Sequence, residues 1–106
     1  MTEKHDSVVE RLAAQAIAAG ANMLDIEYKD GYEEVFAMQG SSDYGHGYGV
    51  AKLKSSSPEA VSLRKELYAI LRRRLRIQVN GCTYSLRCHK YDSFGEDAFR
   101  IELQRL

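Results

Sequence analysis

The chain has 106 residues, of which 44% are apolar and 28% are charged, with equal numbers of acidic and basic side chains. This predicts one folded domain, residues 1–106, and excludes a disordered chain or a chain with two cores. No apolar run approaches the roughly 18 residues that a membrane helix needs, so we expect no membrane insertion. The first residues lack the apolar segment of a signal peptide, which favours a cytoplasmic protein.

The charges are unevenly distributed along the chain. Residues 1–49 hold three Lys/Arg and nine Asp/Glu, a net charge of −6, and residues 50–106 carry the compensating +6. Such an asymmetry either is neutralised inside the fold or steers a partner. Both interpretations stay open at this point.

The first expected element is a helix that begins after Ser7. Ser7 and Glu10 form a capping box, and apolar side chains recur at helical spacing up to Ile17. Gly20 is typical of the residue that follows a helix. The apolar face is narrow and rich in alanine, so this helix can approach a sheet closely.

A β-hairpin is expected next. Leu24, Ile26 and Tyr28 alternate with polar residues, which predicts a strand with one buried face. Asp30-Gly31 is a turn sequence that tolerates positive φ, and residues 32–38 then return as the partner strand.

Residues 40–49 are rich in glycine and serine, which predicts an exposed loop, followed by a short strand over residues 50–53. Ser57-Pro58 marks the start of a second helix, with serine as the cap and proline at the first helical position. We expect residues 72–74, three arginines, to close this helix, where positive charge complements the helix dipole.

The last third of the chain predicts three strands. Apolar and polar residues alternate from Leu75 to Val79, and Asn80-Gly81 is the strongest hairpin turn in the sequence. The partner strand continues to Cys88, and a last strand follows residues 91–96. The order of elements predicts an α+β fold, with two helices packed on one face of a mostly antiparallel sheet of five or six strands.

Four short motifs stand in an order that resembles a known domain. Residues 20–27 read Gly-Ala-Asn-Met-Leu-Asp-Ile-Glu, Gln39-Gly40 ends the second strand, and Leu86-Arg87-Cys88 and Gly95-Glu96 follow later. Their order and spacing resemble the small N-terminal domain of type II secretion and type IV pilus assembly ATPases. In that family a helix ends in Gly-Ala and the next strand reads Ser-Asp-Ile-His-Ile-Glu.

The resemblance implies a docking role. In the family this domain packs against neighbouring motor domains and couples subunit arrangement to nucleotide state, whereas ATP hydrolysis belongs to the motor domain. This chain lacks the motor's P-loop. Val35 and Ala37 replace the family's alternating arginines, and Tyr28 replaces its proline after the first strand. Nucleotide sensing is therefore not implied, and docking onto a protein partner is.

Several residues invite a chemical interpretation. The glycines of residues 45–49 could cradle an anion, but the segment lacks the Lys-Ser/Thr ending of a P-loop, which favours a surface loop. Asp25 and Glu27 share a strand face and would suit paired carboxylates, but exposed strand polarity explains them equally well. We therefore expect no catalytic residue and no cofactor.

The histidines and cysteines do not predict a metal site. His46, His89, Cys82 and Cys88 form no Cys-x-x-Cys or His-x-x-x-His pair. Cys88 and His89 are neighbours and should point to opposite faces of a strand, which also excludes an activated thiolate. The two cysteines lie about 20 Å apart along one strand, beyond disulfide reach.

A basic stretch over residues 62–90 remains, and it suggests an electrostatic contact surface. The candidate partner-binding residues are Arg72, Arg73, Arg76, Arg87 and Arg100. We expect a non-catalytic protein-interaction or regulatory domain with a protein partner. The alternative is a small nucleic-acid-binding protein that uses segment 62–90, although the aromatic signature and high pI of such modules are absent.

Overall fold

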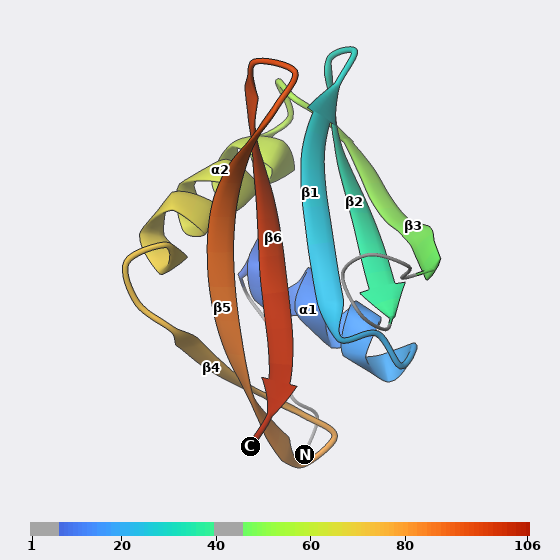
Figure 1. The fold of residues 1–106 in the computed structure, drawn as a ribbon, viewed down its shortest axis with the longest axis vertical. Coiled ribbons are helices and arrows are strands. Elements are labelled where there is room, and N and C mark those ends of the chain that lie inside the picture. The colour runs from blue at the N-terminus through green and yellow to red at the C-terminus, as the bar shows by residue number, and fades with distance from the viewer. Residues whose placement is uncertain (1–6, 40–45) are drawn as a thin grey trace.

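Six antiparallel strands form one sheet, and two helices lie on one of its faces (Figure 1). The structure is a computed structural model, and it describes residues 7–39 and 46–106. The elements follow in the order α1 (Val8–Ala18), β1 (Met23–Lys29), β2 (Tyr32–Gln39), β3 (His46–Lys54), α2 (Pro58–Ile70), β4 (Leu75–Val79), β5 (Cys82–Ser93) and β6 (Glu96–Arg105). The predicted α+β fold is confirmed.

The sheet order is β3-β2-β1-β6-β5-β4. Two three-stranded meanders, one from each half of the chain, are therefore joined by the pairing of β1 with β6. Asp25 lies directly opposite Arg100 in that pairing, and Ile26 lies opposite Phe99. The last strand of the chain thus reaches the centre of the sheet.

The core lies between the helices and the sheet. Alternate strand residues such as Leu24, Ile26, Leu86 and Ile101 are almost fully buried against the apolar faces of α1 and α2. The strand residues expected to point inward include Phe99 and Leu103, and these too are buried. Tyr28 is the exception, since it is exposed and lines a hollow beside α2.

Three hairpin turns have the same backbone conformation, in which both central residues have positive φ. The φ values are 52° and 85° at Asp30-Gly31, 52° and 78° at Asn80-Gly81, and 53° and 84° at Phe94-Gly95. Such type I′ turns match the twist of the strands that they connect. The sequence predicts the first two turns but not the third, because phenylalanine is not a typical turn residue.

Three boundaries differ from the expectation. The last strand was expected after residues 91–96, but β5 continues to Ser93 and β6 already begins at Glu96. The segment 40–49 was expected to be a loop, but β3 already begins at His46, and residues 40–45 lie outside the described residues. Gly47 and Gly49 pair with Met38 and Phe36 of β2, so backbone hydrogen bonding to a neighbouring strand overrides their low strand propensity.

The three arginines after α2 do not close that helix. The helix ends at Ile70, its last buried residue, and Leu71 is its C-cap. Arg72, Arg73 and Arg74 follow in the connection to β4, where their side chains are exposed. The expectation that they complement the helix dipole from within the last turn is therefore wrong.

Candidate interaction site

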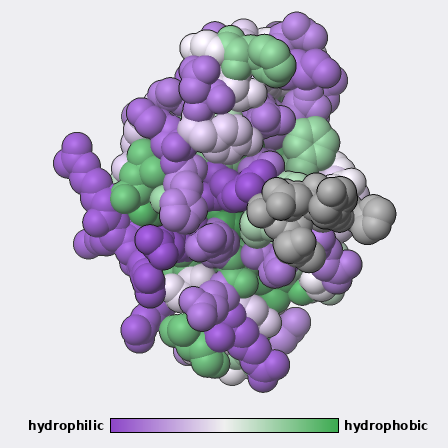
Figure 2. Space-filling model, viewed as in Figure 1, coloured by the Kyte–Doolittle hydropathy of each residue, from purple (hydrophilic) through white to green (hydrophobic). Residues whose placement is uncertain are grey.

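The helices cover one face of the sheet, and no described helix or strand covers the other. Figure 1 views the molecule from this open face, with α1 and α2 behind the strands. Figure 2 shows that the same face is mostly hydrophilic. Residues of β1, β5 and β6 that alternate with the core residues point to this side.

An ion pair stands near the centre of the open face. The Arg100 guanidinium donates two hydrogen bonds to the Asp25 carboxylate, from Nε to Oδ1 and from Nη2 to Oδ2, both 3.1 Å long. Only 9% of Asp25 is exposed. The interpretation of Asp25 as an exposed polar strand residue is therefore wrong. Asp25 forms a bidentate ion pair that joins β1 to β6. The same bonds raise the pKa of Arg100.

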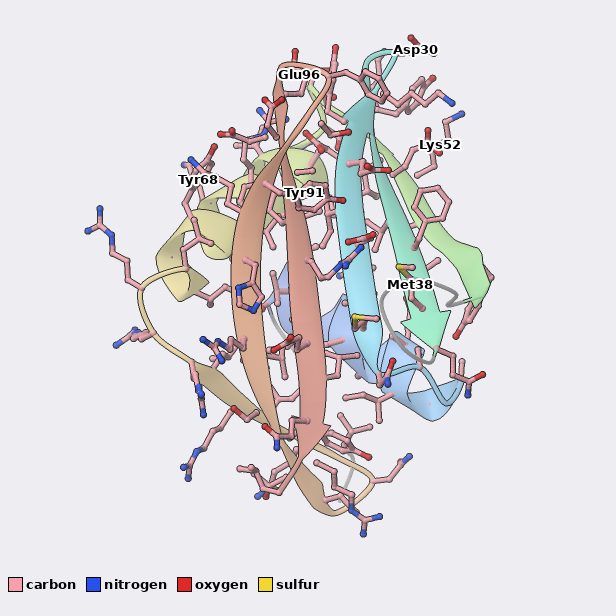
Figure 3. All side chains as sticks on the ribbon, in the orientation of Figure 1. Asp30, Met38, Lys52, Tyr68, Tyr91 and Glu96 are labelled. Atoms are coloured by element: carbon pink, nitrogen blue, oxygen red, sulfur yellow. The ribbon has the colours of Figure 1, made fainter. Side chains whose placement is uncertain are left out.

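Glu27 has its own partners on β5. Its Oε1 accepts hydrogen bonds from the Ser93 hydroxyl at 3.2 Å and from the Tyr91 hydroxyl at 3.4 Å. Burial, together with the charges of Asp25 and Glu27, raises the pKa of Tyr91, which lies in the middle of the sheet in Figure 3. Asp25 and Glu27 thus accept hydrogen bonds from different residues, and this cluster links β1, β5 and β6.

The exposed basic residues gather at a different place, where β4 stops pairing with β5. β5 has 12 residues and β4 only five, and their ladder ends with Leu75 opposite Leu86. Arg87 is the first β5 residue beyond that ladder. The connection from α2 enters the sheet at this point, so its arginines lie beside Arg87.

These arginines surround a shallow hollow of about 280 Å³. Its lining contains Arg72, Arg73, Arg74 and Arg87, with Ile70 and Leu71 as apolar residues and with Cys88 and His89 completing it. We call this hollow the arginine groove. Among the described residues, no carboxylate lies within ion-pair distance of its four arginines. Four exposed guanidinium groups are therefore free to bind an anion.

Two of the candidate arginines lie outside the groove. Arg76 is on β4, opposite Ser85, and it is exposed. Arg100 is occupied by Asp25 and stacks 5.9 Å from the centre of the Tyr91 ring. The structure thus brings Arg72, Arg73 and Arg87 together, adds Arg74, and separates Arg76 and Arg100 from them.

A second polar hollow, of about 380 Å³, lies between α2 and the sheet. Two polar contacts cross it: Arg64 pairs with the buried Glu33, and the Tyr68 hydroxyl donates to Asp97, while Glu96 also lines the hollow. The bond to Asp97 raises the pKa of Tyr68. The Tyr68 ring also stands edge-on to Phe99, with centroids 5.2 Å apart. These contacts hold α2 on the sheet.

The turn between β5 and β6 carries a feature that the sequence did not reveal. Phe94 is fully exposed there, and it is an apolar residue in a turn whose other residues are polar or glycine. A hollow of about 390 Å³ lies below it, between the β5–β6 and β1–β2 hairpins. Figure 2 shows a hydrophobic patch at the end of the molecule where these two turns lie.

The described residues contain no group of three His, Cys, Asp or Glu side chains that could hold a metal ion. Burial raises the pKa of the Cys88 thiol to about 11, and His89 points to the opposite face of β5. Cys88 is therefore a protonated core residue at neutral pH. In the described part of the chain, no helix is long and apolar enough to cross a membrane.

No protein-family model matches this chain, and no curated protein matches it.

Proposed function

We propose that this protein is a non-catalytic docking domain whose arginine groove binds an acidic segment of a partner protein. One observation carries the proposal: four exposed arginines, from two segments of the chain, line one hollow, and none of them has a carboxylate within ion-pair distance among the described residues, although Glu102 of β6 lies opposite Arg87 in the sheet register. Arginine forms strong two-pronged bonds with carboxylates. A groove of this kind recognises Asp- or Glu-rich segments.

The lining favours a protein partner over a nucleic acid. Binding of single-stranded nucleic acid combines phosphate contacts with stacking on aromatic rings, and the groove is lined by Ile70 and Leu71 but by no Phe, Tyr or Trp. Leu71, which is partly exposed, suits an apolar side chain within an acidic segment. The resemblance to the N-terminal domain of secretion ATPases also supports a docking role, because that domain packs against neighbouring domains. The proposal includes a cytoplasmic location, in which the thiols stay free.

Charge reversal tests the groove directly. We expect the variant Arg73→Glu/Arg87→Glu to bind a ten-residue Glu-rich peptide with a central Leu at least about tenfold more weakly than the unaltered protein, because two attractive contacts become repulsive. Fluorescence anisotropy at low salt measures the affinity. The matched control is Arg105→Glu, which reverses an exposed arginine outside the groove.

The same assay includes a thymidine 15-mer as a second probe. Tighter binding of the oligonucleotide than of the peptide, with loss in the double variant, would assign the groove to nucleic acid. Peptide binding that is equal in the double variant and the control would overturn the proposed function.

A further inference from the structure

Phe94 occupies a backbone position that disfavours it. Three hairpin turns within the described residues share one conformation, with a first φ of 52°, 52° and 53°, and the residues there are Asp30, Asn80 and Phe94. Asp and Asn tolerate a left-handed conformation, whereas a bulky side chain there is an outlier. The two other turns thus show which residue types the fold itself prefers.

Burial does not compensate for this strain, because Phe94 is fully exposed. Its side chain gains no packing within the described structure and leaves a large apolar surface in water. A residue can have a backbone conformation that its type disfavours and a side chain that does not stabilise the fold. Such a residue indicates a functional site. An exposed phenyl ring at such a position is suited to contact a second surface.

Carboxylates lie close to Phe94 in the chain and along the hollow that it helps to line. Asp92 and Glu96 lie two residues before and after Phe94. The hollow is also lined by the acidic residues Glu27, Asp30 and Glu34, by Lys29, and by the aromatic rings of Tyr28 and Phe36. Figure 3 shows that Asp30 and Glu96 lie at the same end of the molecule. We call Phe94, with Asp92 and Glu96, the Phe94 tip: an apolar knob with an acidic rim.

The arginine groove has the complementary chemistry. It offers the partly exposed Leu71 to an apolar ring and four arginines to an acidic rim, and guanidinium groups also stack favourably on aromatic faces. The same tip is a poor ligand for an anionic membrane or a nucleic acid, because its carboxylates would be repelled.

We propose that the Phe94 tip of one copy binds in the arginine groove of a second copy of this chain. The inference rests on the docking function proposed above and names the partner. A molecule cannot make the contact with itself, because Phe94 directly follows β5 and lies seven residues beyond Arg87, about 23 Å along an extended chain. Each copy therefore presents one tip and one groove, and the contact is heterologous, so it extends into rings or chains.

Complementation between two variants tests the contact. Phe94→Asn removes the ring but keeps the groove, and Arg73→Glu/Arg87→Glu reverses the groove but keeps the tip. We expect each variant alone to associate at least tenfold more weakly than the unaltered protein. An equimolar mixture should form heterodimers and nothing larger, because only one intact contact is possible. Sedimentation velocity at low salt, up to about 1 mM protein, covers even weak specific association.

Two controls separate lost contact from lost folding. Asn suits the turn better than Phe, so Phe94→Asn should unfold at the same or a higher temperature than the unaltered protein. Tyr48→Asn removes an exposed aromatic side chain from β3 and should leave association unchanged.

An unaltered protein that stays monomeric throughout, or a mixture that forms no heterodimer, would overturn this inference. Binding of the Glu-rich peptide would still decide the proposed docking function on its own, because that assay needs no second copy. Association that persists in both variants would also contradict the proposal.

Discussion

Asp25 shows that the burial of a residue can depend on a partner that is distant in the sequence. It alternates with buried Leu24 and Ile26, so the pattern places it on the solvent side of its strand, and that placement is correct. Yet it is almost buried, because its partner Arg100 arrives from a strand 75 residues further along. No local pattern could have predicted this contact.

Breaking that ion pair should be costly. Arg100→Ala leaves the Asp25 side chain, which is only 12% exposed, without its cation, and we expect a loss of about 2 kcal/mol in the free energy of unfolding. Urea denaturation measures the loss. Asp25→Ala/Arg100→Ala should cost less than the two single changes added together, and Arg105→Ala on the same strand should cost under about 0.5 kcal/mol. Strict additivity would show that the pair is not coupled.

Cys88 gives a second test at this scale. Because burial raises its pKa to about 11, the thiol is almost wholly protonated at pH 8, and the thiolate is the reactive form. In a Cys82→Ser variant we expect iodoacetamide to alkylate Cys88 slowly at pH 8, at a rate that rises with pH until about 11. Mass spectrometry follows the reaction. A rate that levels off near pH 8 would contradict the burial of this thiol.

At the scale of elements, the two helices are joined by a side chain that the sequence did not single out. The expected cap is confirmed in part, since the Ser7 hydroxyl accepts a hydrogen bond from the Glu10 amide. The Glu66 carboxylate of α2 completes it by accepting bonds from the amides of Val8 and Val9 and from the Ser7 hydroxyl. A negative charge thus lies at the positive end of α1.

Removing this carboxylate should loosen both helices. We expect Glu66→Ala to lower the free energy of unfolding by about 2 kcal/mol, because amides at the start of α1 lose a charged acceptor. Thermal or urea unfolding by circular dichroism measures the change. Lys65→Ala alters the neighbouring exposed residue of α2 and serves as the control, and an equal effect of both changes would rule out the capping role.

Elements with a strong local signal were predictable. Ser57-Pro58 fixed the start of α2, and the Asp-Gly and Asn-Gly turns fixed two hairpins, because these residues satisfy helix ends or positive φ by themselves. The third hairpin and the full length of β3 escaped prediction. Phe94 breaks the turn rule, and the glycines of β3 take their conformation from pairing with β2.

At the scale of the whole molecule, part of the charge asymmetry is neutralised inside the fold. Asp25–Arg100 and Glu33–Arg64 join acids of the first half of the chain to bases of the second, which is neutralisation inside the fold. The four arginines of the groove are left over from this pairing. The sequence shows that residues 62–90 are basic. Which of their arginines form ion pairs within the described residues, and which do not, depends on tertiary contacts.

The central pairing of β1 with β6 also has a consequence for how the chain folds. Each three-stranded meander can form from local contacts, yet the sheet closes only when Phe99 and Arg100 meet Ile26 and Asp25. Closing so long a loop is entropically costly and slows folding. A ribosome-bound chain that lacks its last strand therefore exposes the edge of β1, and a chaperone that shields this edge would act on the molecule at its most vulnerable stage.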